Sequence, residues 1–327
     1  MILTQQPLRV SLFGGSTDYP EYFIQHGGAV LGAAINQYVY VGIKPMPPGQ
    51  DLRYRVQYSK VDDCQTVAEI KHPAIRSALQ YYKIDTPLEW HCFGDMPGRA
   101  GLGSSSAFCV GALKALQTHL DLPSSPYPTE LASEAIAFER YMIPETVGYQ
   151  DQIFAAVGRI NFITFDRFGA QVQPLKLSAE REQELEQSLI LVYSGSMRDA
   201  HLMAAKQVSA IPQSDKALSD LVELAHKGKE ILLSENYPLK LIGTMLHDAW
   251  RAKKQLCPEV TTPNIDALYQ RGLDCGAIGG KLLGAGAGGF MLFFVPPQQM
   301  LRFREKIGMP YAQFKVSKSG SRIILNT

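Results

Sequence analysis

The sequence has few cysteines, and none of them lie in the closely spaced pairs of a zinc site or a redox centre. The five cysteines are scattered along the chain: Cys64, Cys92, Cys109, Cys257 and Cys275. An odd number of widely spaced cysteines argues against a disulfide framework and is typical of a reducing compartment. We therefore expect a cytoplasmic protein.

The chain also lacks an excess of charge of one sign. Its 327 residues include 32 basic and 31 acidic side chains, a formal net charge of +1. Such a balance gives no global field that would favour nucleic acid or an anionic membrane. No apolar run is long enough to cross a bilayer, and the first residues lack the pattern of a signal peptide. We expect neither nucleic acid nor a membrane as a partner.

The remaining composition is that of a globular protein that mixes helices with strands. Hydrophobic residues make up 46% of the chain and charged residues 19%, which are ordinary values. No internal repeat is visible. A long helical stretch, from about residue 198 to 272, favours two domains over one doubly wound sheet. We predict an α+β chain with a linker near residues 173–187.

Periodicity predicts individual elements in both halves of the chain. Strands are expected at 8–13, 29–45, 53–58, 87–96, 159–165, 188–195, 277–284, 289–295 and 322–326. Helices are expected at 72–82, 104–120 and 129–142, at the segment that contains Asp151, within 198–272, and before the last strand. Thr129 is the expected N-cap of the helix 129–142.

The stretch PGRAGLGSSSAF (97–108) places three glycines and three serines between a predicted strand and a buried helix. A helix start with free N–H groups and a favourable dipole is a potential phosphate site, and serine hydroxyls can reach a phosphate-bound Mg²⁺. The stretch is not a Walker A loop, because Ser104 stands where that motif has lysine. A tight turn with a helix cap explains the same residues equally well.

A second glycine-rich stretch is GGKLLGAGAGGF (279–290). Gly284, Gly286 and Gly289 satisfy the dinucleotide-binding spacing, but a strand follows them instead of a helix. This context argues against a nucleotide-dependent oxidoreductase. We expect a hairpin that passes close to another backbone or to a ligand, and a purely packing role remains open.

Three carboxylates stand out by their position. In the helix 129–142, Glu139 falls on the apolar stripe, where it needs a partner or a metal, although a glutamate at the stripe's edge could reach solvent. Asp151 lies in the first turn of a short helix, where the dipole favours the ionised form. Asp18 follows a strand and a glycine turn. A helix-start aspartate and a loop aspartate are the plain alternatives for Asp151 and Asp18.

In their order along the chain these segments resemble the GHMP kinase family. PLRVSLFGGSTDYPEYF is similar to the first motif of the family, PGRAGLGSSSAF to the second, and GGKLLGAGAGGFMLFFV to the third. VGYQDQ resembles the segment that carries the catalytic aspartate in the galactokinase-like branch. Ser16 and Ala287 depart from the pattern, because glycine is common at both positions. The departures put the turn before Asp18, and a positive φ at Ala287, in question.

The resemblance implies an ATP-dependent kinase with ATP and Mg²⁺ as cofactors. It assigns the ATP phosphates to Gly98, Gly101, Leu102, Gly103, Ser104, Ser105, Ser106, Gly284 and Gly286. Ser105 and Glu139 would bind Mg²⁺. Asp151 would act on the acceptor hydroxyl as base or as orienter, with Arg9 holding it ionised. Gly15, Asp18 and Tyr19 would contact the acceptor.

The implied fold has a ribosomal-protein-like domain over residues 1–178 and a ferredoxin-like domain over 179–327, with a monomer or a homodimer as the assembly. The implied reaction is phosphorylation of the anomeric C1 hydroxyl, most similar to the branch that acts on a heptose 7-phosphate. A distal phosphate needs a basic anchor, for which Arg99, Arg198 and Lys281 are candidates. A hexose or fucose 1-kinase is the first alternative. A sensor without catalysis is the second, although it would not need the base.

Overall fold

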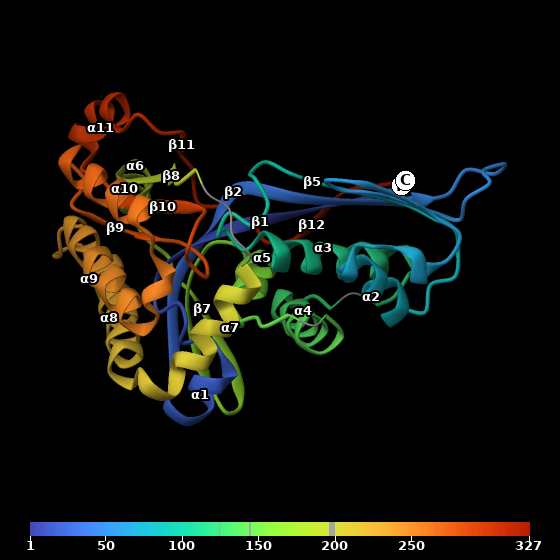
Figure 1. The fold of residues 1–327 in the computed structure, drawn as a ribbon, viewed down its shortest axis with the longest axis horizontal. Helices are drawn as coiled ribbons and strands as arrows, with labels where there is room; N and C mark the ends of the chain where they lie inside the picture. The colour runs from blue at the N-terminus through green and yellow to red at the C-terminus, as the bar shows by residue number, and fades with distance from the viewer. Residues whose placement is uncertain (124, 144, 196–199) are drawn as a thin grey trace.

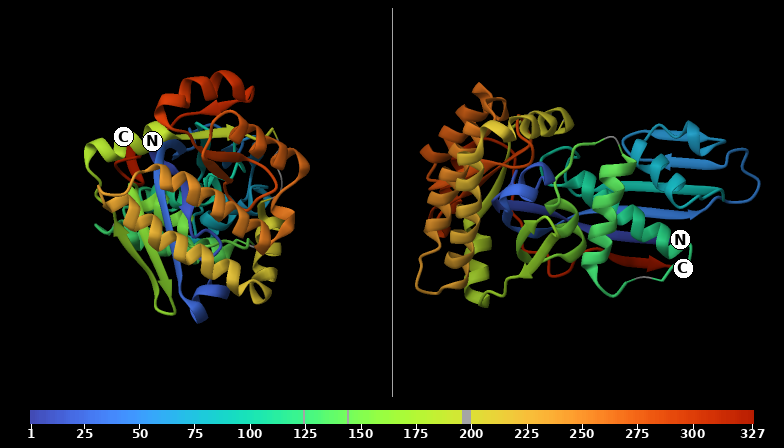
Figure 2. Two further views of the ribbon diagram at one scale, coloured as in Figure 1. Left: turned by 90° about the vertical axis from the view of Figure 1, so that its left-hand side faces the viewer. Right: turned by 90° about the horizontal axis from the view of Figure 1, so that it is seen from below.

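A computed structural model of the chain describes residues 1–123, 125–143, 145–195 and 200–327. Two sheets organise these residues, one of eight strands and one of four (Figure 1). The larger sheet and most of the helices from the first half form one lobe. The smaller sheet and the long helices of the second half form the other (Figure 2). The α+β class predicted from the sequence is confirmed.

The large sheet is built on two long antiparallel strands, β1 (Ile2–Phe13) and β2 (Gly28–Pro45). Its order is β12–β1–β2–β5–β3–β4. The first residues of β2, 28–33, also pair with β6, which in turn pairs with β7. The other strands are β3 (Tyr54–Gln57), β4 (Val61–Cys64), β5 (Leu88–Gly94), β6 (Ile160–Asp166), β7 (Gly169–Pro174) and β12 (Arg322–Asn326). Nearly every residue of β1 and of the first part of β2 is buried, including the polar or charged residues of β1, which are Thr4, Gln5, Gln6, Arg9 and Ser11.

One face of the large sheet is covered by helices (Figure 1). They are α2 (Pro73–Tyr81), α3 (Ser104–His119), α4 (Pro128–Met142) and α5 (Gln150–Val157). The short helix α1 (Pro20–His26) follows β1 and contacts β6. As its apolar surface predicts, α3 is the central helix and packs against β1, β2, α4 and α5. Its start is therefore held in place from several sides.

The small sheet has the strand order of a ferredoxin-like domain. Its strands are β8 (Leu189–Tyr193), β9 (Gly279–Leu282), β10 (Phe290–Phe294) and β11 (Tyr311–Ala312), in the antiparallel order β11–β8–β10–β9. Numbered along the chain this order is fourth, first, third, second, and a helical segment follows the first strand and another the third. These helices are α7 (Ala200–Ala210), α8 (Asp215–Leu233), α9 (Lys240–Leu256), α10 (Pro263–Asp274) and α11 (Met300–Ile307).

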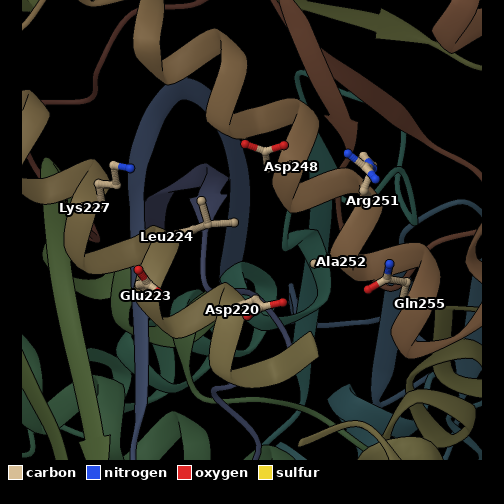
Figure 3. A pocket seen from close by; sticks show the side chains of 8 residues that line it. All are labelled: Asp220, Glu223, Leu224, Lys227, Asp248, Arg251, Ala252 and Gln255. Carbon is tan, nitrogen blue, oxygen red and sulfur yellow. The ribbon is translucent and has the colours of Figure 1, made fainter. Parts of the chain in front are cut away.

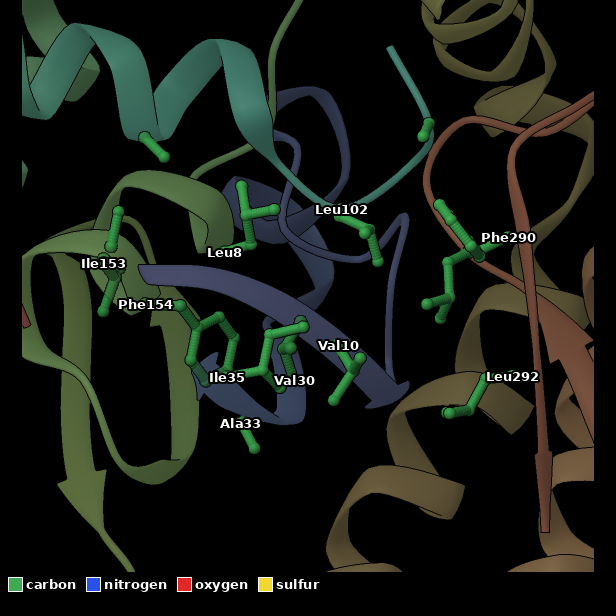
Figure 4. Close-up of a cluster of buried hydrophobic side chains, with 14 of the residues drawn as sticks. Leu8, Val10, Val30, Ala33, Ile35, Leu102, Ile153, Phe154, Phe290 and Leu292 are labelled. Carbon is green, nitrogen blue, oxygen red and sulfur yellow. The ribbon is translucent and has the colours of Figure 1, made fainter. Parts of the chain in front are cut away.

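Apolar side chains continue from one lobe into the other. Figure 4 shows Leu8 and Val10 of β1 with Leu102 of the loop before α3, and Phe290 and Leu292 of β10 on the side of the small sheet. All five are buried members of the core. In addition, α8 packs against β1 and β2. The lobes therefore meet through a hydrophobic seam, which fixes the loop before α3 against the small sheet.

The structure contains α1, β4, β7 and β11, which were not predicted from the sequence. It differs from the sequence-based expectations at three further places. Residues 173–187, predicted as a linker, form the end of β7 and most of α6 (Ala179–Ser188), whose exposed polar face hides its helical period. β12 belongs to the large sheet instead of the second lobe. Thr129 does not cap α4, because that helix begins one residue earlier at Pro128 and Tyr127 is its N-cap.

A polar groove lies between α8 and α9, lined by Asp220, Glu223, Lys227, Asp248 and Arg251 among others (Figure 3). It lies on the helical layer of the second lobe, and its lining includes no residue of the glycine-rich segments. Among the described residues no helix is both long enough and apolar enough to cross a bilayer.

Candidate active site

The glycine–serine loop, residues 97–106, follows β5 and includes the first residues of α3. Gly103 is the N-cap of α3 in a left-handed conformation with a φ of +76°, and no side chain caps the helix. The first N–H groups of a helix have no partner within the helix, and together with its dipole they attract anions. The start of α3 can therefore bind an anion, and a serine-capped turn is not what the structure shows.

Arg9 of β1 forms hydrogen bonds with this loop through both its backbone and its side chain. The backbone N–H of Arg9 donates to the carbonyl of Leu102 at 3.0 Å, and its guanidinium Nη1 donates to the carbonyl of Gly101 at 2.6 Å. The side chain of Leu102 points into the core and is 1% exposed. The position of the loop is thus set by the first strand of the protein.

The second glycine segment, residues 283–289, packs against the same loop. An ideal Cβ on Gly284 would lie 2.5 Å from the Cα of Gly101, and both residues have a positive φ. The backbone N–H of Phe290 donates to the carbonyl of Ala100 at 3.1 Å. The hairpin expected from the sequence is confirmed as one that passes close to a backbone, that of the glycine–serine loop.

Ala287 and Ser16 keep the backbone that glycine would adopt. Ala287 has a φ of +62° and Ser16 a φ of +83°. A non-glycine residue in this region carries strain of about 1–3 kcal/mol, so other contacts must fix it there. Ala287 is buried and its N–H donates to the carbonyl of Val260 at 2.7 Å. The question raised by the sequence is settled in favour of a positive φ at Ala287.

Asp151 and Arg9 form a two-pronged ion pair beside the glycine–serine loop. The Nε and Nη2 atoms of Arg9 each donate to one carboxylate oxygen of Asp151 at 2.7 Å. Arg9 is buried, and the side chain of Asp151 is 23% exposed. An ideal Cβ on Gly103 would lie 3.1 Å from Oδ2 of Asp151, so glycine leaves the space in front of this carboxylate open. Asp151 can therefore act on a group bound at the start of α3.

The two glutamines that flank Asp151 each hold another carboxylate. Gln150 Nε2 donates to Oδ1 of Asp18 at 2.9 Å, and Gln152 Nε2 donates to Oε2 of Glu139 at 2.6 Å. Gln150, Asp151 and Gln152 lie in the first turn of α5, about 100° apart around the helix axis. Neither glutamine was predicted from the sequence. Their only signal was their position on either side of the aspartate.

Glu139 is fully buried and lies on the apolar stripe of α4. The alternative that it lies at the edge of the stripe and reaches solvent is therefore excluded. Besides Gln152, its carboxylate accepts a hydrogen bond from Ser106 Oγ at 3.0 Å. Ser105, the neighbour for which the sequence implied a shared metal with Glu139, is exposed. Burial raises the pKa of Glu139 to about 8 in spite of the hydrogen bonds. A nearby cation would offset the free-energy cost of burying the charged carboxylate.

Asp18 joins the loop after β1 to the start of α5. Its carboxylate accepts hydrogen bonds from the backbone N–H groups of Ser16 and Gln150, at 3.1 and 3.2 Å. Burial, followed by the charge of Asp151, raises the pKa of Asp18. Tyr19 and Asp18 are buried and Gly15 is partly buried. Asp18 therefore acts as a cap for α5 and lies near Asp151.

The proposed anchors for a distal phosphate fare differently. Arg99 and Gly98 are exposed, and Arg99 has a φ of +58°. Arg198 lies outside the described residues. Lys281 is buried, with its ammonium group donating to the carbonyl of Leu12 at 3.1 Å, so it ties β9 to β1. Of the three, Arg99 is the one that the structure describes with its side chain at the surface.

Lys253 of α9 lies under the second glycine segment. Its Nζ donates to the carbonyls of Leu282 and Gly284. Burial, with a smaller effect from the charge of Arg9, lowers the pKa of Lys253 to about 7. Burial also lowers the pKa of Lys281 strongly. One buried lysine, Lys253, therefore supports the segment that faces the glycine–serine loop, and a second, Lys281, ties the preceding strand β9 to β1.

No cluster of three metal-ligating His, Cys, Asp or Glu side chains occurs within the described part of the chain. A metal here would need ligands from a bound phosphate, which is usual for Mg²⁺.

Comparison with family models matches both halves of the chain. Residues 68–159 match the GHMP kinase N-terminal domain, and residues 236–311 match the GHMP kinase C-terminal domain. A D-glycero-α-D-manno-heptose 7-phosphate kinase of Campylobacter jejuni is 30% identical over 308 residues, which cover 90% of each chain. A bifunctional fucokinase/GDP-fucose pyrophosphorylase of Arabidopsis thaliana is 27% identical, over 95% of this chain and 31% of that protein.

Solved structures show the same fold. A D-glycero-D-manno-heptose 1-phosphate kinase from Bacteroides thetaiotaomicron superposes with a TM-score of 0.80 at 23% identity and covers 100% of both chains. Lactococcus lactis galactokinase, solved with galactose, superposes with a TM-score of 0.72 at 17% identity, covering 98% of this chain and 94% of its own.

The two matched domains and the two-lobed fold define an ATP-dependent phosphotransferase. The chain belongs to the GHMP kinase family.

The buried ammonium of Lys253 predicts a pH-dependent stability. The unfolded chain keeps this proton up to the usual lysine pKa of 10.5, whereas the folded chain loses it from about pH 7. Between these values the unfolded state binds more protons, so stability rises with pH. Lys253→Met should make this rise smaller, as measured by urea unfolding between pH 7 and pH 10. Lys281 remains and contributes in the same direction.

Lys254→Met is the matched control, because Lys254 is partly exposed and forms a surface ion pair with Asp266. It should leave the slope of stability against pH as in the parent protein. An unchanged slope in Lys253→Met would contradict the prediction.

Proposed function

We propose that the protein is a sugar kinase of the cytoplasm that transfers the γ-phosphate of ATP to the anomeric C1 hydroxyl of D-glycero-D-manno-heptose 7-phosphate. The observation that carries this proposal is the ion pair of Arg9 and Asp151 directly beside the uncapped start of α3. It brings a candidate base next to a candidate phosphate site. The similarity to the Campylobacter jejuni heptose 7-phosphate kinase supports the choice of acceptor.

ATP fits the glycine-rich region in its chemistry. Gly101, Gly103, Gly284 and Gly286 all have a positive φ. The lack of a Cβ lets the two glycine segments pack backbone against backbone, since an ideal Cβ on Gly284 would lie 2.5 Å from the Cα of Gly101. Ser104 begins the helix and Leu102 anchors the loop. Backbone N–H groups with the helix dipole bind phosphate without a lysine. We assign the triphosphate to this region.

Mg²⁺ fits the residues near Glu139. Glu139 is a buried carboxylate with two neutral hydrogen-bond donors, and burial disfavours its charge. We propose that Glu139 and Ser105 hold Mg²⁺ together with the ATP phosphates, while Ser106 and Gln152 orient the carboxylate. When bound, Mg²⁺ neutralises charge on the transferring phosphate.

Asp151 is proposed to accept the proton of the acceptor hydroxyl. An anomeric hydroxyl is more acidic than an ordinary alcohol, so a carboxylate is an adequate base. Arg9 fixes the orientation of Asp151 through both guanidinium contacts. In phosphoryl transfer, positioning and charge neutralisation supply most of the rate enhancement. A sensor without catalysis would not require this geometry.

The acceptor is proposed to bind near Gly15, Asp18 and Tyr19. The carboxylate of Asp18 is a strong acceptor for sugar hydroxyls, and with Asp151 it makes this region unfavourable for an anionic head group. The observation therefore favours a sugar hydroxyl at this place over a carboxylate. A distal phosphate would lie farther away, with Arg99 or Arg198 as its proposed anchor.

Asp151→Asn should keep the fold and ATP binding but lower kcat by about 10²–10⁴-fold, because the amide cannot accept the proton. Turnover and nucleotide affinity should be measured alongside the unfolding midpoint. Asp248→Asn on the exposed face of α9 is the control and should keep parental kcat. Near-parental turnover in Asp151→Asn would remove Asp151 from the reaction.

Glu139→Gln should raise the Mg²⁺ concentration needed for half-maximal activity more than it lowers thermal stability. The amide resembles the protonated acid that burial favours, so the empty site tolerates it, but it is a poor ligand for Mg²⁺. Glu134→Gln in the same helix, where the carboxylate bonds Tyr82 and Gln117, is the control. An identical Mg²⁺ dependence in Glu139→Gln and the parent would refute the metal assignment.

Removal of the distal phosphate from the acceptor should lower kcat/KM. The loss of each charge-assisted hydrogen bond costs about 1.5–3 kcal/mol. The heptose and its 7-phosphate are compared under identical conditions, the phosphorylated position is assigned by NMR, and hexoses and fucose are included. A preference for the 7-phosphate that weakens in Arg99→Ala or Arg198→Ala supports both acceptor and anchor.

Equal kcat/KM for the heptose and its 7-phosphate would defeat the heptose phosphate assignment and favour a kinase of neutral sugars. If the preference survives both arginine substitutions, the anchor assignment alone is wrong.

A further inference from the structure

A buried glutamine of α7 connects the loop after β1 to the second glycine segment. Gln207 is 2% exposed. Its Oε1 accepts a hydrogen bond from Ser16 Oγ at 3.0 Å, and its Nε2 donates to the carbonyl oxygen of Ala285. Ser16 belongs to the first lobe and Ala285 to the second. One side chain thus bridges the lobes at the site.

The chemistry of the partners fixes the direction of this bridge. The carbonyl of Ala285 can only accept, so the amide nitrogen of Gln207 must face it. The amide oxygen then faces Ser16, whose hydroxyl is the donor. A flip of the amide would place Oε1 of Gln207 against the carbonyl oxygen of Ala285, so that two acceptors would face each other. The amide therefore keeps one orientation, and its two hydrogen bonds link the two loops.

Ser16 adopts a strained backbone and gains a hydrogen bond through its hydroxyl. Glycine would adopt the φ of +83° without strain, whereas the Cβ of serine makes this conformation sterically unfavourable. The hydrogen bond to Gln207 is a contact that glycine could not make. The N–H of Ser16 also donates to Asp18, which in turn binds Gln150 beside Asp151.

A continuous chain of hydrogen bonds therefore runs from Ala285 through Gln207 and Ser16 to Asp18. Ala285 lies between Gly284 and Gly286, which are assigned to the ATP phosphates. Asp18 is assigned to the acceptor. The chain connects the two substrate regions without passing through the catalytic ion pair.

We propose that Gln207 is a positioning residue that, with Ser16, couples nucleotide binding to the order of the acceptor loop, residues 14–18. The inference rests on the proposed function for the acceptor role of that loop, but the coupling itself involves only the nucleotide. Nucleotide binding at the glycine segment restrains Ala285, and the bridge transmits the restraint to Ser16 and Asp18. The coupling free energy is the difference between the free energies of local opening of residues 14–18 in the nucleotide-free and the nucleotide-bound protein.

Amide hydrogen exchange with the non-hydrolysable analogue AMP-PNP and Mg²⁺ tests the coupling without any acceptor. In the parent protein, the nucleotide should slow exchange at residues 98–106 and also at 14–18. The slowing at 14–18 should be about five-fold or more, the lower end of coupling between sites. In Gln207→Ala it should vanish at 14–18 and persist at 98–106.

Two substitutions at Ser16 separate the hydrogen bond from the backbone strain. Ser16→Ala keeps the strain and loses the hydroxyl, whereas Ser16→Gly loses both. Both should abolish the nucleotide effect at 14–18, and Ser16→Gly should be the more stable of the two. Ser209→Ala in the same helix, where the hydroxyl is exposed and bonds only Ala205 among the described residues, should behave as the parent.

The proposal is overturned if the nucleotide protects 98–106 but not 14–18 in the parent, or if it protects 14–18 equally in Gln207→Ala. It is also overturned if Ser16→Gly retains the protection. Failure of the acceptor assignment is a separate result, because it would appear in the comparison of sugars and would leave these exchange patterns unchanged.

Discussion

The ion pair and hydrogen bonds formed by the guanidinium of Arg9 are the interactions on which the rest of the site depends. It binds both oxygens of Asp151 and the carbonyl of Gly101, while the backbone of the same residue holds Leu102. The start of α5, the loop before α3 and the first strand are therefore fixed by one buried residue. A buried charge of this kind needs its partners, because removal of one leaves the other unpaired in a medium of low polarity. The carboxylate and the helix start keep their relative position as a result.

The first turn of α5 distributes three side chains to three different parts of the first lobe. Gln150 turns to Asp18 after β1, Asp151 to Arg9 within β1, and Gln152 to Glu139 on α4. Adjacent residues on a helix point in directions about 100° apart, so three neighbours in sequence can serve three elements. The two neutral amides bring hydrogen-bond donors to two buried carboxylates without adding charge. The three acidic residues thus stay close together without three cations to balance them.

Much of this arrangement could be predicted from the chain, and the exceptions have physical causes. The apolar stripe indicated an inward Glu139 but left a solvent-exposed edge position open, and the glycine–serine stretch predicted the start of α3, because both features depend on local sequence. The partner of Glu139 could not be predicted in the same way, since Ser105 and Ser106 are neighbours and only packing decides that Ser106 turns inward. Gln207 carried no signal at all, because its role depends on two loops far away in sequence. α6 was missed because its exposed face is almost entirely polar, and the strand β12 was found but its sheet was not.

The pairing of β12 with β1 has a consequence for how the chain reaches this structure. The large sheet is completed by a strand that follows the entire second lobe, so part of the first lobe forms through contacts of very long sequence separation. Contacts of this kind close late, because the entropy of a long loop opposes them. During synthesis the ferredoxin-like lobe has all its strands before the large sheet does. The lobe that contains Arg9 and Asp151 is therefore the last to be completed, and its outer edge along β1 stays open for pairing until β12 has been made.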